Sequence, residues 1–204
     1  MIEKPNLTFS RPLVPFKKRI TKIVCHHPAH PTWTIHDIHK YHRDKLGWIG
    51  IGYNYFITFD GRIQQGRGRH VGAHVSGHND NTLGVCFQGD FEKQKMTDAQ
   101  VKAGAKLIAN LLRNEGLQIS DVIGHRDLTN TACPGKNFRM DDLKQAILTE
   151  LNSKAVTSVD KPSEWAKSSW EKATKAGIVD GKNPREPLTR EQFTVILDRL
   201  GLIK

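Results

Sequence analysis

The sequence lacks a long apolar segment. No stretch in its 204 residues is long and apolar enough to span a membrane as a helix. The opening run "MIEKPNLTFSRPLVPF" has no continuous apolar core of the kind that a Sec signal peptide needs. We therefore expect synthesis in the cytoplasm, no insertion into a membrane, and release by another route for any action outside the cell.

Cysteine is also scarce, with three residues in the chain. So small a number excludes a disulfide framework. Cys25 and Cys86 belong to the apolar runs "ITKIVC" and "LGVCF", so we expect both to be small, buried hydrophobic residues. Cys133 lies instead in the polar stretch "GHRDLTNTACPG" and needs another explanation.

Acidic residues are fewer than basic ones. Lys and Arg number 31 against 21 Asp and Glu, which gives a formal charge of +10 and a pI near 9.6. Such a charge attracts polyanions: nucleic acid, an anionic membrane surface, or an anionic polymer such as teichoic acid. The basic residues are spread along the chain without a basic recognition helix or an aromatic-basic motif, which argues against nucleic-acid binding.

Apolar periodicity predicts alternating strands and helices between residues 20 and 151. The strand-like segments are 19–25, 53–66, 82–90 and 120–125, of which 53–66 is typical of a hairpin that turns at Asp60-Gly61. The helix-like segments are 34–47, 97–116 and 140–152, with Thr34 and Thr97 as N-caps and Gly116 as a C-cap. This order predicts an α/β domain, preceded by an extended arm at 1–19.

The composition changes after this domain. Residues 152–162 have the composition of a linker, and residues 163–204 predict a helix, a turn and a second helix. Gly177 would end the first helix, and Thr189 with Gln192 would form a capping box for the second. The expected core positions are Trp165, Trp170, Ile178, Val195, Ile196 and Leu200. Because about fifty residues bury little surface alone, we expect this segment to pack on the first domain or on a partner.

The stretch "GHRDLTNTACPG" places His125 and Cys133 at the two ends of one loop. Histidine and cysteine are ligands suited to zinc, and a catalytic zinc usually takes three protein ligands and one water. The third ligand would be His26 or His27, both at the end of the strand-like run "KIVC". The alternative is a loop histidine and a thiol next to proline that bind no metal.

Four motifs in this order resemble the zinc-dependent N-acetylmuramoyl-L-alanine amidases of the type-2 amidase family, which includes phage endolysins and animal peptidoglycan recognition proteins. They are "IVCHHPA", "WIGIGYNYFITFDGRI", "VGAHVSGHNDNTLGVCFQGDF" and "GHRDLTNTACPG". The resemblance covers about Ile20 to Leu151. It implies a mixed β-sheet flanked by helices and a Zn²⁺ bound by His26, His125 and Cys133.

The resemblance also implies roles for residues near the metal. Tyr53 would lie near the metal-bound water or the substrate carbonyl, unless it only packs in the core. His74 would be a groove histidine near the substrate, able to stabilise the oxyanion or move protons. Thr131 stands where some members have lysine, so we expect only an assisting hydrogen bond from it. Asn79 would contact the substrate or stabilise its own loop.

His36, His39 and His42 recur at a spacing of one helical turn and suggest a second metal site. The type-2 amidases often have a histidine at the position of His42 without a metal. We therefore favour helix-surface or supporting roles for the three.

The resemblance implies a bacteriolytic hydrolase that cleaves the amide between N-acetylmuramic acid and L-alanine, an endolysin released at lysis where a phage encodes it. The alternative function is a non-catalytic peptidoglycan-binding module, and members of that kind typically lack the cysteine ligand. The segment 163–204 resembles a single S-layer-homology-like motif, which favours attachment to the cell wall, with a structural cap or dimerisation element as the alternative. Peptidoglycan and anionic wall polymers are the expected partners.

Overall fold

The computed structural model describes residues 1–159, 162–179 and 190–203. The chain forms two compact units, Met1–Glu150 and Leu151–Lys204, and the division falls within one helix. Among the described residues, no helix is both long enough and apolar enough to cross a lipid bilayer.

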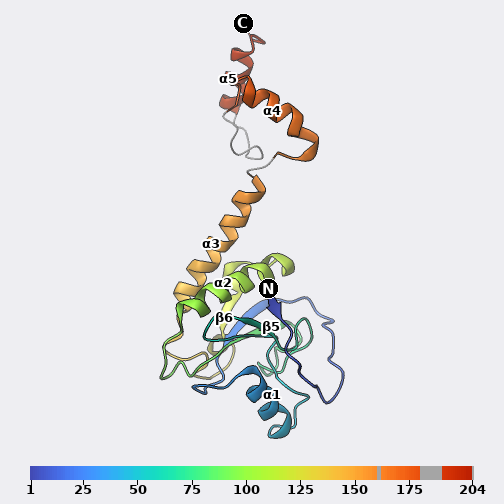
Figure 1. The fold of residues 1–204 in the computed structure, drawn as a ribbon, viewed down its shortest axis with the longest axis vertical. Helices are drawn as coiled ribbons and strands as arrows, with labels where there is room; N and C mark the ends of the chain where they lie inside the picture. Colours follow the sequence, from blue (N-terminus) through green and yellow to red (C-terminus); the bar gives the residue numbers. More distant parts are fainter. Residues whose placement is uncertain (160–161, 180–189, 204) are drawn as a thin grey trace. The chain divides into compact units, whose positions relative to one another are not determined.

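A six-stranded mixed sheet forms the centre of the first unit, in the order β1-β4-β3-β5-β2-β6 (Figure 1). The strands are β1 (Ile2–Glu3), β2 (Lys22–His26), β3 (Tyr55–Ile57), β4 (Ile63–Gln65), β5 (Thr82–Phe87) and β6 (Val122–Gly124). All pairs are parallel except β3 with β4. This antiparallel pair is the hairpin predicted at Asp60-Gly61, where Gly61 has a φ of 82°.

Helices cover both faces of the sheet, with α1 (Ile35–Asp44) on one side and α2 (Asp98–Glu115) on the other (Figure 1). The predicted caps are confirmed: Thr34 and Thr97 each form a capping box, and Gly116 ends α2 with a left-handed φ of 65°. The caps could be predicted because each depends on residues within one turn. The predicted mixed sheet with flanking helices is therefore present.

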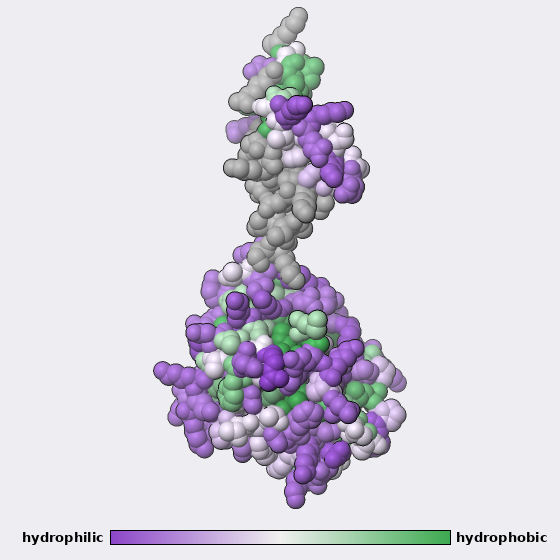
Figure 2. Space-filling view, in the orientation of Figure 1, coloured by the Kyte–Doolittle hydropathy of each residue, from purple (hydrophilic) through white to green (hydrophobic). Residues whose placement is uncertain are grey.

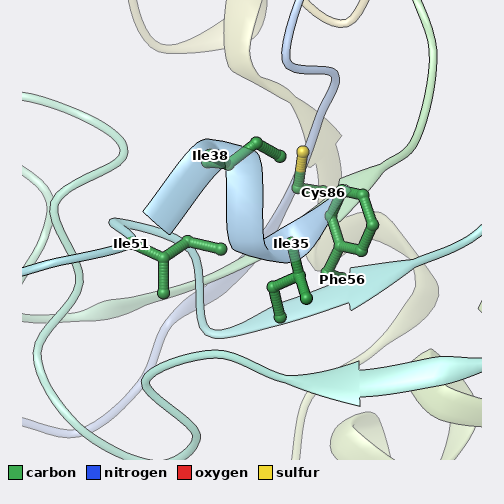
Figure 3. Packing of buried hydrophobic residues seen from close by; sticks show 5 residues of the cluster. All are labelled: Ile35, Ile38, Ile51, Phe56 and Cys86. Atoms are coloured by element: carbon green, nitrogen blue, oxygen red, sulfur yellow. The ribbon is translucent and has the colours of Figure 1, made fainter. Parts of the chain in front are cut away.

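The two faces of β5 contribute to two apolar layers, because successive side chains of a strand point to opposite faces. Cys86 packs under α1 with Ile35, Ile38, Ile51 and Phe56 (Figure 3). On the other face, Phe87 lies so close to Gly104 of α2 that a Cβ there would be 2.7 Å from its ring. Cys25 and Cys86 are fully buried, as their apolar surroundings predicted.

The segment 1–19, predicted to be an arm, is part of the first unit. Ile2 and Glu3 form β1 and pair with β4. Leu7 and Phe9 pack against the apolar cluster under α1, and the carbonyl of Thr8 lies 3.0 Å from Nε2 of His39. Two apolar residues of this segment, Leu7 and Phe9, thus extend the core of the first unit.

The end of α3 differs from the prediction. This helix covers Met140–Val159 and not 140–152, so most of the predicted linker 152–162 is helical. Neither glycine nor proline occurs between Asn152 and Val159, and Lys and Ala favour a helix, so the chain has no local signal to stop.

The second unit contains the two predicted helices, α4 (Lys167–Lys175) and α5 (Arg190–Arg199). Gly177 follows α4 with a φ of 68°, as predicted for a helix end. The predicted capping box at Thr189 lies outside the described residues.

The predicted core of the second unit is wrong at three positions. Trp165 is 89% exposed, and Val195 and Leu200 are each about half exposed. Trp170, Ile178 and Ile196 are half-buried. A short helical pair has too little interior to enclose all of these side chains. Apolar residues accordingly appear on the surface of this unit in Figure 2, whereas polar residues cover much of the first unit on the face in view.

Candidate metal centre

Two histidines meet at the carboxyl ends of neighbouring parallel strands. His26 is the last residue of β2, and His125 directly follows β6. The register pairs Cys25 with Gly124, so the next residue on each strand lies beside the other. The two imidazole rings are 4.6 Å apart between centroids. The sheet thus brings together two residues that are far apart in the sequence.

The loop after β6 returns and places Cys133 next to these histidines. The carbonyl of Cys133 accepts a hydrogen bond from the backbone N–H of Arg126 (2.9 Å), and the Arg126 guanidinium donates to the carbonyl of Ala132 (2.8 Å). The Thr131 hydroxyl accepts a hydrogen bond from the Cys133 N–H at 3.2 Å. Thr131 is therefore engaged in shaping the loop that carries Cys133.

The ligand atoms of His26, His125 and Cys133 all lie within 4.8 Å of one another. Nδ1 of His26 is 3.6 Å from Sγ of Cys133. A nitrogen at roughly 2.05 Å and a sulfur at about 2.3 Å from one tetrahedral zinc would be about 3.6 Å apart, so this pair fits a zinc ion. The donor set of two imidazoles and one thiol suits the same metal.

Burial controls the protonation of these three side chains. Burial lowers the pKa of His26 well below its usual value, and His74 and His125 add to this effect. Burial also lowers the pKa of His125, so both rings are neutral and able to bind a metal at pH 7. Burial raises the pKa of the Cys133 thiol to about 11. Metal binding at this cysteine would therefore release a proton.

Tyr53 lies next to the candidate metal ligands. Its ring centroid is 5.2 Å from that of His26, and its ring also packs against the apolar cluster under α1. Burial raises the pKa of the phenol well above its usual value, and the neighbouring Cys86 contributes to the same shift. The sequence left two interpretations of Tyr53, packing in the core and a place near the site. The side chain does both.

His74 contacts His26, one of the candidate metal ligands, directly. Its Nδ1 is 3.0 Å from Nε2 of His26, and the residue is 8% exposed. Burial lowers its pKa to about 3, partly opposed by the backbone of Thr82. Among the described residues, Nε2 of His74 has no hydrogen-bond partner.

A cavity of about 550 Å³ opens beside His125, one of the three candidate ligands. Its lining includes Trp48, His74, Asn79, His125 and Thr129. The Asn79 side chain accepts hydrogen bonds from the backbone N–H groups of His74 (2.7 Å) and Val75 (2.9 Å). Asn79 thus stabilises its own loop while it lines the cavity.

His27 is not among the clustered ligands. Its Nδ1 accepts a hydrogen bond from the N–H of Phe91 at 3.0 Å, and its ring stacks on that of Phe91. The strand's alternation turns His27 away from the face on which His26 lies. Of the two histidines that the sequence left open, the structure thus places His26 in the cluster.

The three histidines of α1 do not gather around a common point. His36 is exposed, whereas His39 and His42 are buried. The N–H of Ile51 donates to Nδ1 of His39 (3.2 Å), and the N–H of Gly52 donates to Nδ1 of His42 (3.0 Å). Both rings therefore hold the segment that leads into Tyr53, the kind of supporting role that the sequence favoured.

Arg67 is a buried residue near the site that the sequence reasoning missed. It is 6% exposed and donates from Nε to the carbonyl of Ile51 (2.7 Å) and from Nη1 to that of Val71 (2.9 Å). Its charge also lowers the pKa values of His42 and His74. No pattern in "GRGRH" distinguishes this arginine from the exposed ones nearby.

Comparison with known proteins gives one family. The profile of Amidase_2, described as N-acetylmuramoyl-L-alanine amidase, matches residues 16–136. Peptidoglycan-recognition protein SC2 of Drosophila melanogaster is 39% identical over 107 residues, which are 51% of this chain and 58% of that relative. The chain therefore matches less than two thirds of that protein's length.

Solved structures of the same kind share the fold. The endolysin N-acetylmuramoyl-L-alanine amidase LysCS from Clostridium intestinale superposes with a TM-score of 0.67 at 30% identity, covering 72% of this chain and 95% of that one. Peptidoglycan recognition protein LE in complex with tracheal cytotoxin, a monomeric diaminopimelic acid-type peptidoglycan, gives 0.60 at 26% identity, covering 66% and 85%. With the profile match across more than half of its length, the chain belongs to the N-acetylmuramoyl-L-alanine amidase family.

Proposed function

We propose that this protein is a zinc-dependent hydrolase of the amide between N-acetylmuramic acid and L-alanine in peptidoglycan. The observation that carries the proposal is the convergence of His26, His125 and Cys133 beside an open cavity. Family membership supports the reaction, and the three donor atoms support the metal.

Different residues of the chain would have different roles around the metal. A zinc ion bound by the three ligands would polarise the scissile carbonyl and lower the pKa of a water molecule. The Tyr53 phenol keeps its proton to high pH, so it can donate a hydrogen bond to charge that develops on the substrate oxygen. Asn79 holds the loop of His74, and Thr131 holds the loop of Cys133.

We further propose that the protein acts on bacterial cell walls as an endolysin. The structural similarity to an endolysin amidase covers nearly all of that chain, which supports this role. The charge of +10 would favour binding to anionic wall polymers. The exposed apolar side chains of the second unit, Trp165 among them, are available for attachment to the wall.

A second candidate function is peptidoglycan recognition without cleavage. It is supported by the name of the Drosophila relative and by the recognition protein that holds a peptidoglycan fragment. The presence of Cys133 within reach of both histidines argues for hydrolysis instead, because recognition alone does not require a thiol at this place.

Two measurements on the purified protein distinguish hydrolysis from recognition without cleavage. We expect about one zinc per chain by elemental analysis and a cleared band in a peptidoglycan zymogram. Cys133→Ser should lose both zinc and clearing, whereas His36→Ala, at an exposed position on α1, should keep both. Binding to peptidoglycan without clearing in the zinc-loaded protein would favour recognition, and full zinc occupancy in Cys133→Ser would refute the ligand assignment.

A further inference from the structure

The two ring nitrogens of His26 face different partners. Nδ1 lies 3.6 Å from Sγ of Cys133, on the side of the proposed metal. Nε2 lies 3.0 Å from Nδ1 of His74. A neutral imidazole carries its single proton on one nitrogen and binds a metal through the other. Which nitrogen of His26 is free to bind is therefore decided by what its second nitrogen contacts.

We propose that His74 is a positioning residue that accepts the Nε2–H of His26 and thereby holds His26 in the tautomer whose Nδ1 binds the metal. The inference rests on the proposed metal site. Metal-binding histidines usually donate their second N–H to an acceptor, which fixes both the tautomer and the ring orientation. Here the acceptor is the Nδ1 lone pair of a second neutral imidazole, so the proton of His74 lies on its Nε2.

The surroundings of His74 restrict the position of its ring. A Cβ atom on Gly84 would lie 2.6 Å from Cγ of His74, and one on Gly72 would lie 2.4 Å from Cδ2. The ring therefore lies against two positions where the chain has no side chain. The rings of His74 and His26 are nearly perpendicular, at 84°, with centroids 5.0 Å apart. This geometry points Nδ1 of His74 at the edge of the His26 ring.

A neutral acceptor has a consequence for the charge of the centre. One thiolate and two neutral imidazoles leave a net charge of +1 on a bound zinc. An ionised carboxylate at the place of His74 would orient His26 equally well, but it would offset that charge. Histidine provides the orientation and leaves the positive charge available to the substrate.

The competing role for His74 is direct contact with the substrate through Nε2, since the residue lines the cavity and this nitrogen is without a partner among the described residues. Two substitutions separate the roles. His74→Asn keeps an acceptor near the place of Nδ1 and removes Nε2. His74→Leu keeps the bulk and removes both polar atoms.

The first measurement uses the full-length chain, stripped of metal with a chelator and labelled with ¹⁵N. Long-range ¹H–¹⁵N correlation spectra report which nitrogen of His26 carries the proton. We expect the proton on Nε2 in the wild type and in His74→Asn, and a mixture of tautomers in His74→Leu. A proton on Nδ1 in the metal-free wild type would overturn the inference without any variant.

The second measurement is zinc affinity by competition with a chelator dye. Loss of a supporting contact typically weakens metal binding by roughly 10- to 100-fold, and we expect this of His74→Leu. His74→Asn should bind zinc nearly as tightly as the wild type. Equal affinity in wild type and His74→Leu, or equal weakening in both variants, would overturn the positioning role. A wild type that binds no zinc would refute the metal site, while the tautomer measurement would still decide the hydrogen bond.

Discussion

At the scale of single residues, the environment of Tyr53 joins the core to the site. Its ring contacts the apolar cluster under α1 and lies 5.2 Å from the ring of His26. Burial raises the pKa of the phenol, so the hydroxyl stays protonated through the neutral and mildly alkaline range. The residue can therefore donate a hydrogen bond at every pH at which peptidoglycan hydrolysis would be measured.

Tyr53→Phe removes this hydroxyl and keeps the ring. We expect turnover on soluble muropeptide to fall by about 10²- to 10³-fold, the range for the loss of one oxyanion donor, with unchanged zinc content. Tyr55→Phe in β3 is the matched control, since the described ring contacts of His26 do not include Tyr55. Equal turnover in Tyr53→Phe and the wild type would leave Tyr53 with a packing role alone.

The candidate ligands could be predicted from the sequence, whereas their supporting contacts could not. His125 and Cys133 follow from residue types within one motif, whereas the choice of His26 over His27 depended on the resemblance to a family. The contact of His74 with His26 depends on how closely β5 and the loop of Gly72 approach, a distance that no local pattern encodes. The burial of Arg67 could not be predicted either, because one of its acceptors is the carbonyl of Ile51, which precedes it by 16 residues.

At the scale of elements, α1 supports the site through buried histidines. His39 and His42 accept hydrogen bonds from the N–H groups of Ile51 and Gly52 and can do so only when neutral. Burial, reinforced by Arg67, lowers the pKa of His42 to about 4. The hydrogen bonds that hold the segment before Tyr53 against α1 therefore depend on pH.

This coupling predicts acid sensitivity. The unfolded chain binds a proton at His42 below about pH 6.5 and the folded chain only below about 4, so the unfolding free energy falls as the pH drops through this window. This difference between the two pKa values corresponds to roughly 3 kcal/mol. His42→Asn keeps an acceptor for Gly52 but does not titrate. Urea unfolding of metal-free protein between pH 4 and 7.5 should show a smaller slope for this variant, and equal slopes would contradict the coupling.

The caps of α2 give a second prediction at this scale. The Thr97 hydroxyl accepts from the N–H of Gln100 (3.1 Å) and donates to the carbonyl of Phe59 (2.8 Å). Thr97→Ala should lower the unfolding free energy by about 1 kcal/mol and leave zinc content unchanged. Thr149→Ala, on an exposed face within α3, is the control and should change stability little. Equal effects of the two substitutions would contradict a capping role.

Elements whose limits are set by local chemistry could be predicted, and elements set by distant packing could not. Thr34 and Thr97 begin their helices, and Gly116 ends α2, through contacts within one turn. The packing of Leu7 and Phe9 on the core required the three-dimensional arrangement. The extension of α3 to Val159 is instead consistent with local chemistry, because the segment contains no residue that stops a helix, although its composition had indicated a linker.

At the scale of the whole molecule, the proposed attachment to the cell wall would depend on charge and on exposed apolar surface. The net charge of +10 is spread over the chain, and the second unit exposes apolar side chains such as Trp165, Leu200 and Leu202. A second unit that serves attachment would be dispensable for the chemistry of the first.

Removal of the residues after Val159 tests this division. We expect the truncated protein to keep its zinc and its activity on soluble muropeptide, but to sediment less with whole walls. Wall binding by the full chain should weaken as salt rises, because the screening length is about 8 Å at physiological ionic strength and shorter above it. Unchanged sedimentation would refute an attachment role, and a lower melting temperature would indicate a structural cap.

The two outermost strands of the sheet, β1 and β6, have two and three residues. A long strand at a sheet edge presents a row of unpaired N–H and C=O groups on which another chain can assemble. Edges this short present few such groups, so copies of the protein have little backbone through which to join. Concentrated solutions should therefore resist the edge-to-edge growth that leads to fibrils, even though the sheet itself has six strands.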